Sequence, residues 1–191
     1  MAFDKDTCYR ETFTGLSLEN ETVKGVFFEE CVFENCSFVT CTFERCRFLT
    51  CKLTGCILSA IMPTNTRFED VSFVSCKAIG VNWTRAMETR KLRFKDSQVN
   101  YSNFRFTKLP DLMLVNCEAR DSDFIEADLK GAVMKKTDFQ NTYFSKTNLT
   151  NADFREAVNY SIDPATNILK KTKFSMPEVM GLLDSFDIII E

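Results

Sequence analysis

Bulky apolar residues recur at every fifth position over most of this chain, and that period limits what the chain can fold into. From Phe28 to Leu58 each fifth residue is Phe or Leu, and after a skip at Pro63 the spacing resumes at Phe68. One extra residue precedes Phe94, and the period then runs on to Phe154. Five residues rotate an α-helix by roughly 140° beyond a full turn, and an odd step along a flat strand reverses the face. Neither element keeps these residues on one side.

A very short strand followed by a corner does fit a period of five. The residue two places before each bulky one is nearly always Ala, Cys, Ser, Thr or Val. Both then face inward, the bulky residue at the axis and the small one where two walls meet and space is limited. We therefore expect an all-β solenoid whose coils stack by parallel pairing about 4.8 Å apart, with the remaining residues facing water.

Composition excludes much enzymatic chemistry. The chain has 191 residues, a formal net charge of -3 and no His, which removes Ser–His and Cys–His nucleophile pairs and imidazole acid–base catalysis. No glycine-rich phosphate loop, nucleophile elbow or pair of carboxylates stands out from the repeat. We expect one domain that is not an enzyme, with no catalytic residue and no cofactor. The N-terminus lacks the pattern of a signal peptide and no long apolar segment occurs, which predicts a soluble, cytoplasmic protein.

The cysteines are expected to be packing residues. A free Cys packs as a small apolar residue, and eight of the nine occupy the small inward position, namely Cys31, Cys36, Cys41, Cys46, Cys51, Cys56, Cys76 and Cys117. The alternative is a zinc site formed by the first four of these on the four walls of one coil. It would need four thiolates within about 2.3 Å of one ion, where Phe side chains are expected. The uniform spacing also disfavours a disulfide framework.

Several repeats carry a recognisable pattern. Ala127-Asp-Leu-Lys-Gly131 and Ala152-Asp-Phe-Arg-Glu156 resemble the A-[DN]-[LF]-x-x motif of the pentapeptide-repeat family. The resemblance implies a right-handed, quadrilateral parallel β-helix with four repeats per coil. It would span residues 1–160, with phase breaks near 61–65 and 84–93.

The last residues follow a different pattern and are expected to form a capping and dimerisation module over 161–191. Ser175-Met-Pro-Glu178 predicts a capping box at the start of a short amphipathic helix, and Asp187–Glu191 a strand-like tail. The helix either plugs its own coil or is covered by a second copy. For the second case, the predicted interface of a homodimer is Met176, Val179, Leu182, Leu183, Phe186, Ile188 and Ile190.

Parts of the chain are similar to one group within the family. Asn159-Tyr-Ser-Ile-Asp-Pro164 and Gly80-Val-Asn-Trp83 resemble segments of Qnr-type quinolone-resistance proteins. The resemblance implies a dimeric rod that mimics duplex DNA, binds a type II topoisomerase (DNA gyrase or topoisomerase IV) and relieves quinolone poisoning. The physical reason is that outward carboxylates can stand in for phosphates in a basic DNA-binding saddle. We expect no direct binding to nucleic acid and none to a membrane.

Two surfaces are candidates for contact with that partner. One is acidic, formed by outward residues just before the bulky positions: Asp123, Asp128, Asp138 and Asp153. The other is the break, with Arg85, Met87 and Arg90. Acidity is also concentrated in residues 1–34, which hold eight Asp or Glu against three Lys or Arg. Lysines and arginines lie among the four aspartates, so a plain solvated face, or a scaffold that binds a different partner, is the alternative.

Overall fold

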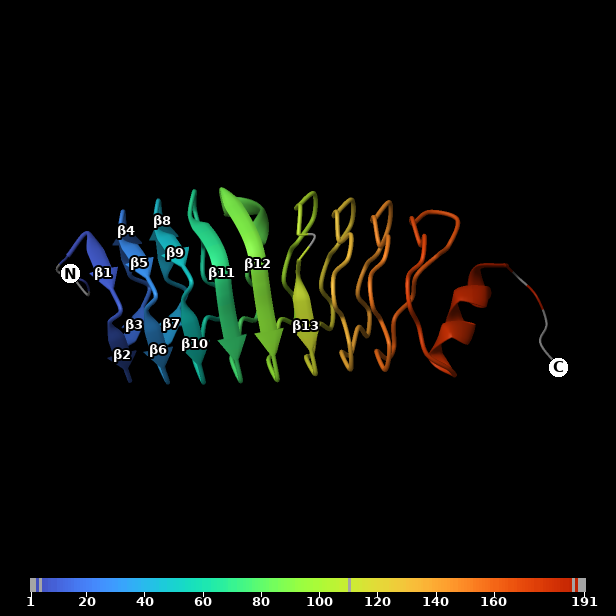
Figure 1. The fold of residues 1–191 in the computed structure, drawn as a ribbon, viewed down its shortest axis with the longest axis horizontal. Coiled ribbons are helices and arrows are strands. Elements are labelled where there is room, and N and C mark those ends of the chain that lie inside the picture. Colours follow the sequence, from blue (N-terminus) through green and yellow to red (C-terminus); the bar gives the residue numbers. More distant parts are fainter. Residues whose placement is uncertain (1–2, 4, 110, 187, 189–191) are drawn as a thin grey trace.

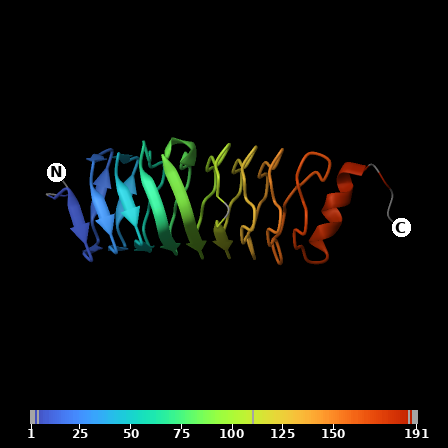
Figure 2. The same cartoon turned by 45° about the horizontal axis from the view of Figure 1, so that its top comes forward.

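The computed structural model describes residue 3, residues 5–109 and 111–186, and residue 188, and the chain forms a long rod of stacked coils. The coils advance steadily from the N-terminus to the C-terminus, where a short helix closes the rod (Figures 1 and 2). The elements, in chain order, are β1 (Thr7–Tyr9), β2 (Thr12–Thr14), β3 (Ser17–Glu19), β4 (Thr22–Lys24), β5 (Phe27–Glu29), β6 (Val32–Glu34), β7 (Ser37–Val39), β8 (Thr42–Glu44), β9 (Arg47–Leu49), β10 (Lys52–Thr54), β11 (Arg67–Val74), η1 (Trp83–Arg85), β12 (Glu88–Lys95), β13 (Met113–Val115) and η2 (Glu178–Phe186).

The strands form four walls. The first wall contains β1, β5, β9 and the first halves of β11 and β12, and the second contains β2, β6, β10, the second halves of β11 and β12, and β13. The third wall begins with β3 and β7 and the fourth with β4 and β8. Isolated parallel bridges continue the walls towards the C-terminus. Every pair is parallel and most registers step by twenty residues, as in Phe28 opposite Phe48, which confirms the expected four-sided parallel β-helix with four repeats per coil.

The core runs along the axis, as the five-residue period predicts. The bulky inward residues are almost completely buried and stack on their equivalents in the next coil. The ring centroids of Phe28 and Phe48 lie 4.8 Å apart, and those of Phe48 and Phe68 lie 5.0 Å apart. Such offset or parallel aromatic pairs add stabilisation beyond the burial of apolar area.

The small inward residues pack and also form hydrogen bonds. The Cys51 thiol donates to the carbonyl oxygen of Phe28 at 3.4 Å, and the Thr147 hydroxyl donates to that of Phe124 at 2.9 Å. All nine cysteines are buried free thiols, which confirms their expected role in packing. Cys, Ser and Thr suit this position because they are small and can each donate to a buried carbonyl that would otherwise keep one lone pair unused.

The corners are made by residues in the left-handed region of backbone space. The residue two places after the bulky one has a positive φ in nearly every repeat, for example 52° at Asn35, 57° at Asn141 and 64° at Gly55. This conformation turns the chain between walls and restores the inward face for the next repeat. It favours Gly, Asn and Asp, and these types are frequent at the corners.

The two phase breaks differ. At the first, Thr42 bridges Met62, so the register still steps by twenty. At the second, Arg67 pairs with Glu88, a step of 21, and the register returns to twenty when Arg93 pairs with Met113. The single extra residue expected before Phe94 is therefore present, in the turn that contains η1 and the exposed Met87.

Each end of the rod is covered by an apolar side chain. Phe3 packs its ring against Phe13 and Phe28, with centroid distances of 5.3 and 4.9 Å. At the other end, parallel bridges continue beyond residue 160 as far as Lys173, and η2 then lies over the last coil, with Leu182 packed against the core.

The predicted capping box is wrong. The Ser175 hydroxyl oxygen accepts a hydrogen bond from the backbone N–H of Glu156 at 2.8 Å, so it serves the preceding coil and not the start of the helix. The helix forms as a 3-10 helix, Glu178–Phe186. Of the predicted tail, only Ile188 belongs to the described residues, and Ile190 lies outside them.

Candidate functional site

The four candidate aspartates lie on four different walls. Asp123 bridges Tyr143 on the fourth wall and Asp128 bridges Asn148 on the first. Asp138 belongs to the third wall and Asp153 to the second, where it bridges Lys173. The structure therefore does not bring them together in one patch but distributes them around the rod.

Each of these carboxylates closes a local turn. Its Oδ1 accepts a hydrogen bond from the backbone N–H two residues later, at 2.9 Å for Asp123 and Ile125 and at 3.0 Å for Asp138 and Gln140. Asp128 and Asp153 do the same. This is the hydrogen bond of an Asx turn, which Asn provides equally well. The Asp or Asn of the repeat motif thus has a structural role that sequence analysis did not assign.

Ion pairs tie three of the aspartates to the preceding coil. The Asp123, Asp138 and Asp153 carboxylates lie 3.3, 2.8 and 3.2 Å from the cations of Arg105, Arg120 and Lys135, each eighteen residues earlier. The Arg155 guanidinium is also 2.7 Å from Asp153. The cations that the sequence places among the aspartates therefore neutralise them directly.

These contacts change the acidity of two aspartates. Hydrogen bonds from Arg155 hold the pKa of Asp153 well below its ordinary value, against the opposing effect of burial. Partial burial acts to raise the pKa of Asp138, but hydrogen bonds from Asn159, the Gln140 backbone and Arg120 outweigh it, and the pKa is lowered. Both groups are thus charged at neutral pH and held by partners within the protein.

A second set of carboxylates lies near the N-terminal end. In the described part of the chain, no Lys or Arg side chain lies within ion-pairing distance of these four, which are Glu19, Glu21, Glu29 and Glu34. Three of them are exposed and Glu29 is half-buried. The acidity of residues 1–34 is visible in the sequence, but nothing there distinguishes these four residues from the other acidic ones. Their lack of ion-pair partners could not be predicted from the sequence, because ion pairing depends on which residues face one another in adjacent coils.

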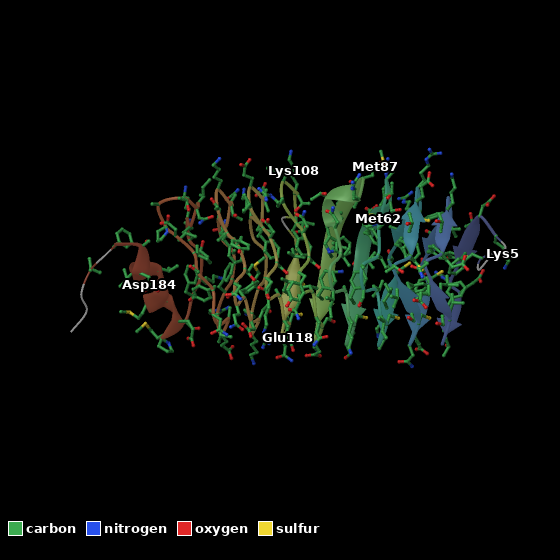
Figure 3. All side chains as sticks on the ribbon, turned by 180° about the vertical axis from the view of Figure 1, so that it is seen from behind. Lys5, Met62, Met87, Lys108, Glu118 and Asp184 are labelled. Carbon is green, nitrogen blue, oxygen red and sulfur yellow. The ribbon has the colours of Figure 1, made fainter. Side chains whose placement is uncertain are left out.

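The break presents its candidate residues to solvent. Arg85 and Arg90 are exposed, and Met87 is 61 % exposed. Met87 and Lys108 extend from the same edge of the rod in Figure 3, opposite Glu118. A groove of about 710 Å³ lies between the next coil and the segment formed by η1 and the start of β12. Residues 83, 84 and 86–90 line one side, and residues 105–108 with Asp111 line the other.

The predicted dimer interface is only partly covered by its own coil. Val179, Leu182 and Leu183, which belong to η2, are half-buried, whereas Met176, Phe186 and Ile188 are exposed, Met176 by 70 %. The helix therefore plugs the last coil with one face and leaves apolar side chains beside it in contact with solvent.

Two further properties bear on function. Across residues 5–109 and 111–186, no three side chains of the types that bind metals are grouped as a site. Neither helical segment in the described part of the chain has the length and apolar character of a membrane span.

Comparison with known proteins identifies the repeat. A sequence model described as "Pentapeptide repeat region" matches residues 26–104, and one described as "Pentapeptide repeats (8 copies)" matches residues 122–158, together more than half of the chain. No curated protein matches the sequence.

Solved structures with the same fold include two trypsin-treated variants of QnrB1, described as a plasmid-mediated fluoroquinolone resistance protein. The first is 19 % identical, covers 97 % of this chain and 98 % of its own, and has a TM-score of 0.57. The second is 16 % identical, covers 94 % and 100 %, and has a TM-score of 0.51. At this identity the likeness shows a shared fold over nearly the whole length.

Proposed function

Because this chain belongs to the pentapeptide-repeat family, we propose that it acts by binding a partner protein, without catalysis, and that this partner is a type II topoisomerase. In this proposal the rod occupies the saddle of DNA gyrase or topoisomerase IV that normally holds duplex DNA, and it protects the enzyme from quinolones. Because these enzymes act on the chromosome, the protein would work in the cytoplasm.

The observation that carries the proposal is the arrangement of carboxylates on all sides of a straight rod. Asp123, Asp128, Asp138 and Asp153 lie on four different walls, and the unpaired glutamates extend the negative charge towards the N-terminal end. Duplex DNA likewise presents phosphates all around its axis, one charge per about 1.7 Å. A basic saddle can therefore meet carboxylates on several walls. Asp128 and the four glutamates have no ion-pair partner among the described residues, whereas Asp123, Asp138 and Asp153 would exchange partners within the protein for those of the saddle.

The C-terminal end supports a dimer. The exposed apolar residues beside η2 are Met176, Phe186 and Ile188. Covering them with the same surface of a second copy would bury them by a two-fold contact, the commonest symmetry of soluble homo-oligomers. The result would be a double-length rod with η2 at its centre. The resemblance of the segment Asn159–Pro164 to Qnr-type proteins, which implies a dimeric rod, supports the same assembly.

Two assays test this proposal: supercoiling by purified gyrase and decatenation by topoisomerase IV. Each is run with and without a fluoroquinolone. We expect micromolar protein to inhibit the reaction or to reduce drug-stabilised DNA cleavage. A variant with Glu19→Gln, Glu21→Gln, Glu29→Gln and Glu34→Gln should lose much of the effect. A matched control with the exposed Lys52→Gln and Lys77→Gln should keep it. No effect of the wild-type protein on either enzyme, with or without drug, would refute the proposal.

A scaffold that binds a different protein is the second candidate. The pairing of Arg105, Arg120 and Lys135 with the aspartates favours it, because these pairs cancel much of the negative potential, and the net charge is only -3. A pull-down from lysate distinguishes the two candidates. Recovery of a topoisomerase subunit supports the first, and reproducible recovery of another protein without one supports the second.

A further inference from the structure

The stack of coils opens at one corner beside the second break. The second half of β12 pairs with β13, but among the described residues no bridge joins its first half, Glu88–Arg90, to Lys108 in the next coil. Lys108 instead bridges Asp128 on its other side. The first half of β12 thus has one free edge, and a free strand edge is a template for an added strand.

The groove of about 710 Å³ lies along this edge. One side is formed by Trp83, Met87 and β12, and the other by Arg105, Phe106 and Lys108. Its volume is within the range of about 300–1,000 Å³ that is common for ligand sites. The extra residue of the 21-residue coil lies in the turn between Trp83 and Glu88, which belongs to the first of these sides.

Two buried donors at this groove have no acceptor in the described part of the protein. They are the indole N–H of Trp83, a residue only 1 % exposed, and the Nε of Arg105. Buried donors without partners are rare because leaving them unpaired costs free energy. Both side chains line the groove, so an occupant there can bring oxygen acceptors beside them.

The charge and the apolar lining indicate which occupant fits. Three cations, Arg90, Arg105 and Lys108, line the groove against two carboxylates, Glu88 and Asp111. Arg105 also pairs with Asp123 at 3.3 Å and Arg90 with Glu88 at 4.0 Å, which leaves Lys108 without an ion-pair partner among the described residues. Met87 and Phe106 are more than 60 % exposed at its rim, and the Arg105 guanidinium lies over the Phe106 ring at 5.5 Å. A ligand with a carboxylate and an apolar side chain next to it matches this lining.

We propose that the groove binds an extended acidic peptide segment of a partner protein, which adds a strand along Glu88–Arg90 and places a carboxylate at Arg105 and Lys108. Main-chain hydrogen bonds to a strand edge supply affinity, and side-chain pockets supply specificity. A nucleic acid fits less well, because its phosphates need many cations and would meet Glu88 and Asp111. The inference goes beyond the proposed function, since it does not depend on which protein carries the segment.

A short capped peptide in which Glu and Val alternate is the probe. Trp83 is the only tryptophan, so its fluorescence reports on the groove, and titration calorimetry provides a second readout. We expect saturable binding with a shift in Trp83 emission. Arg105→Gln and, separately, Lys108→Gln should weaken binding, by about tenfold where a charge-assisted contact is lost.

The matched control is Arg120→Gln. Arg120 pairs with Asp138 on the third wall as Arg105 pairs with Asp123 on the fourth, so this variant should bind the peptide as the wild type does. Circular dichroism of each variant establishes that the β-helix is intact. Lys108→Gln keeps the test valid if Arg105→Gln disturbs the fold.

Four results would overturn the inference. They are no binding of the peptide, equal binding of a peptide with Gln in place of Glu, equal binding of free glutamate, and stronger binding of a single-stranded oligonucleotide. The supercoiling assay is a separate test. Peptide binding without any effect on a topoisomerase refutes only the proposed function, and an effect on a topoisomerase without peptide binding refutes only the groove.

Discussion

The rings of Phe104 and Phe124 are stacked with their centroids 4.7 Å apart and their planes inclined by only 2°. Trp83 continues this column on one side, at 5.9 Å from Phe104, and Phe144 on the other, at 5.3 Å from Phe124. The ring spacing follows the spacing of parallel strands. Each ring in the column therefore packs against two coils at once, and its removal weakens both contacts.

Phe124→Ala is expected to lower the free energy of unfolding by about 3–5 kcal/mol, because Phe124 is fully buried and the coils above and below cannot close the cavity. Tyr143→Ala, at an exposed aromatic residue of the next coil, should cost less than about 1 kcal/mol. Denaturant unfolding followed by circular dichroism measures both. Equal effects of the two variants would show that the column does not stabilise the rod.

Thr147→Val should destabilise the protein by about 0.5–1.5 kcal/mol although the two side chains have similar shapes. The lost hydroxyl donates to the Phe124 carbonyl inside the core, and that oxygen would keep only its bond from the Ala127 backbone N–H. Thr147→Cys should restore most of the stability, because Cys fills the equivalent position in earlier coils. The same unfolding measurement applies, and a Cys variant no better than the Val variant would contradict this hydrogen-bonding role.

The thiols of Cys51 and Cys117 should be inert in the folded protein. Burial raises the pKa of Cys51 to about 12 and that of Cys117 to about 11, so both remain protonated at pH 8, whereas the thiolate is the reactive form. A chromogenic disulfide reagent should react slowly with the native protein and with all nine thiols in guanidinium. Because the unfolded chain releases these protons more readily, stability should fall as the pH rises above about 8.5. Rapid native reaction of Cys51 or Cys117 would contradict this prediction.

Asp153 should contribute stability that is lost in acid. Its pKa is lowered in the folded state, mainly by Arg155, so the unfolded chain takes up the proton first. The contribution is complete above the ordinary Asp pKa of about 4 and declines as the pH falls below it. Urea unfolding at a series of pH values should show that Asp153→Asn is less stable at neutral pH and less sensitive to acid. The exposed Asp184→Asn serves as control, and identical pH profiles for the two variants would refute the prediction.

The proposed dimer should dissociate when its apolar contact becomes charged. Phe186→Asp combined with Ile188→Asp places two carboxylates where a second copy would pack, and desolvating unpaired charges is costly. Light scattering should give twice the protomer mass for the wild type and the protomer mass for this variant. Met87→Asp combined with Phe106→Asp, at exposed residues elsewhere, should leave the mass unchanged. A monomeric wild type would show that η2 only plugs its own coil.

The architecture could be predicted from the sequence because each repeat contains a bulky residue and, two places before it, a small one, and these two residues indicate the inward face. Phe124 and Cys117 are recognisable as core from their place in the period alone, and so is the extra residue before Phe94. The resemblance to a known family then gave the number of walls, which the register confirms.

The surfaces were less predictable, because they depend on which residues meet across coils. The pairing of Arg105 with Asp123 follows from a spacing of eighteen residues, a signal that is present in the sequence but has meaning only once the coil length is known. Ser175 occupies the first position of a capping-box pattern in the sequence. Its hydroxyl oxygen instead accepts a hydrogen bond from the backbone N–H of Glu156 in the preceding coil. The groove lies where, among the described residues, no bridge joins Glu88–Arg90 to Lys108. No residue type in the sequence predicts the absence of that bridge.

The open seam beside Glu88–Arg90 also has a mechanical consequence. A solenoid is held together only by contacts between adjacent coils. Under heat or tension, the interface between coils that has the fewest contacts is therefore expected to separate first. At this seam, no bridge of the first wall joins the two coils among the described residues. Under stress the rod should crack at this point into a phenylalanine-rich leading segment and a trailing segment that melts on its own.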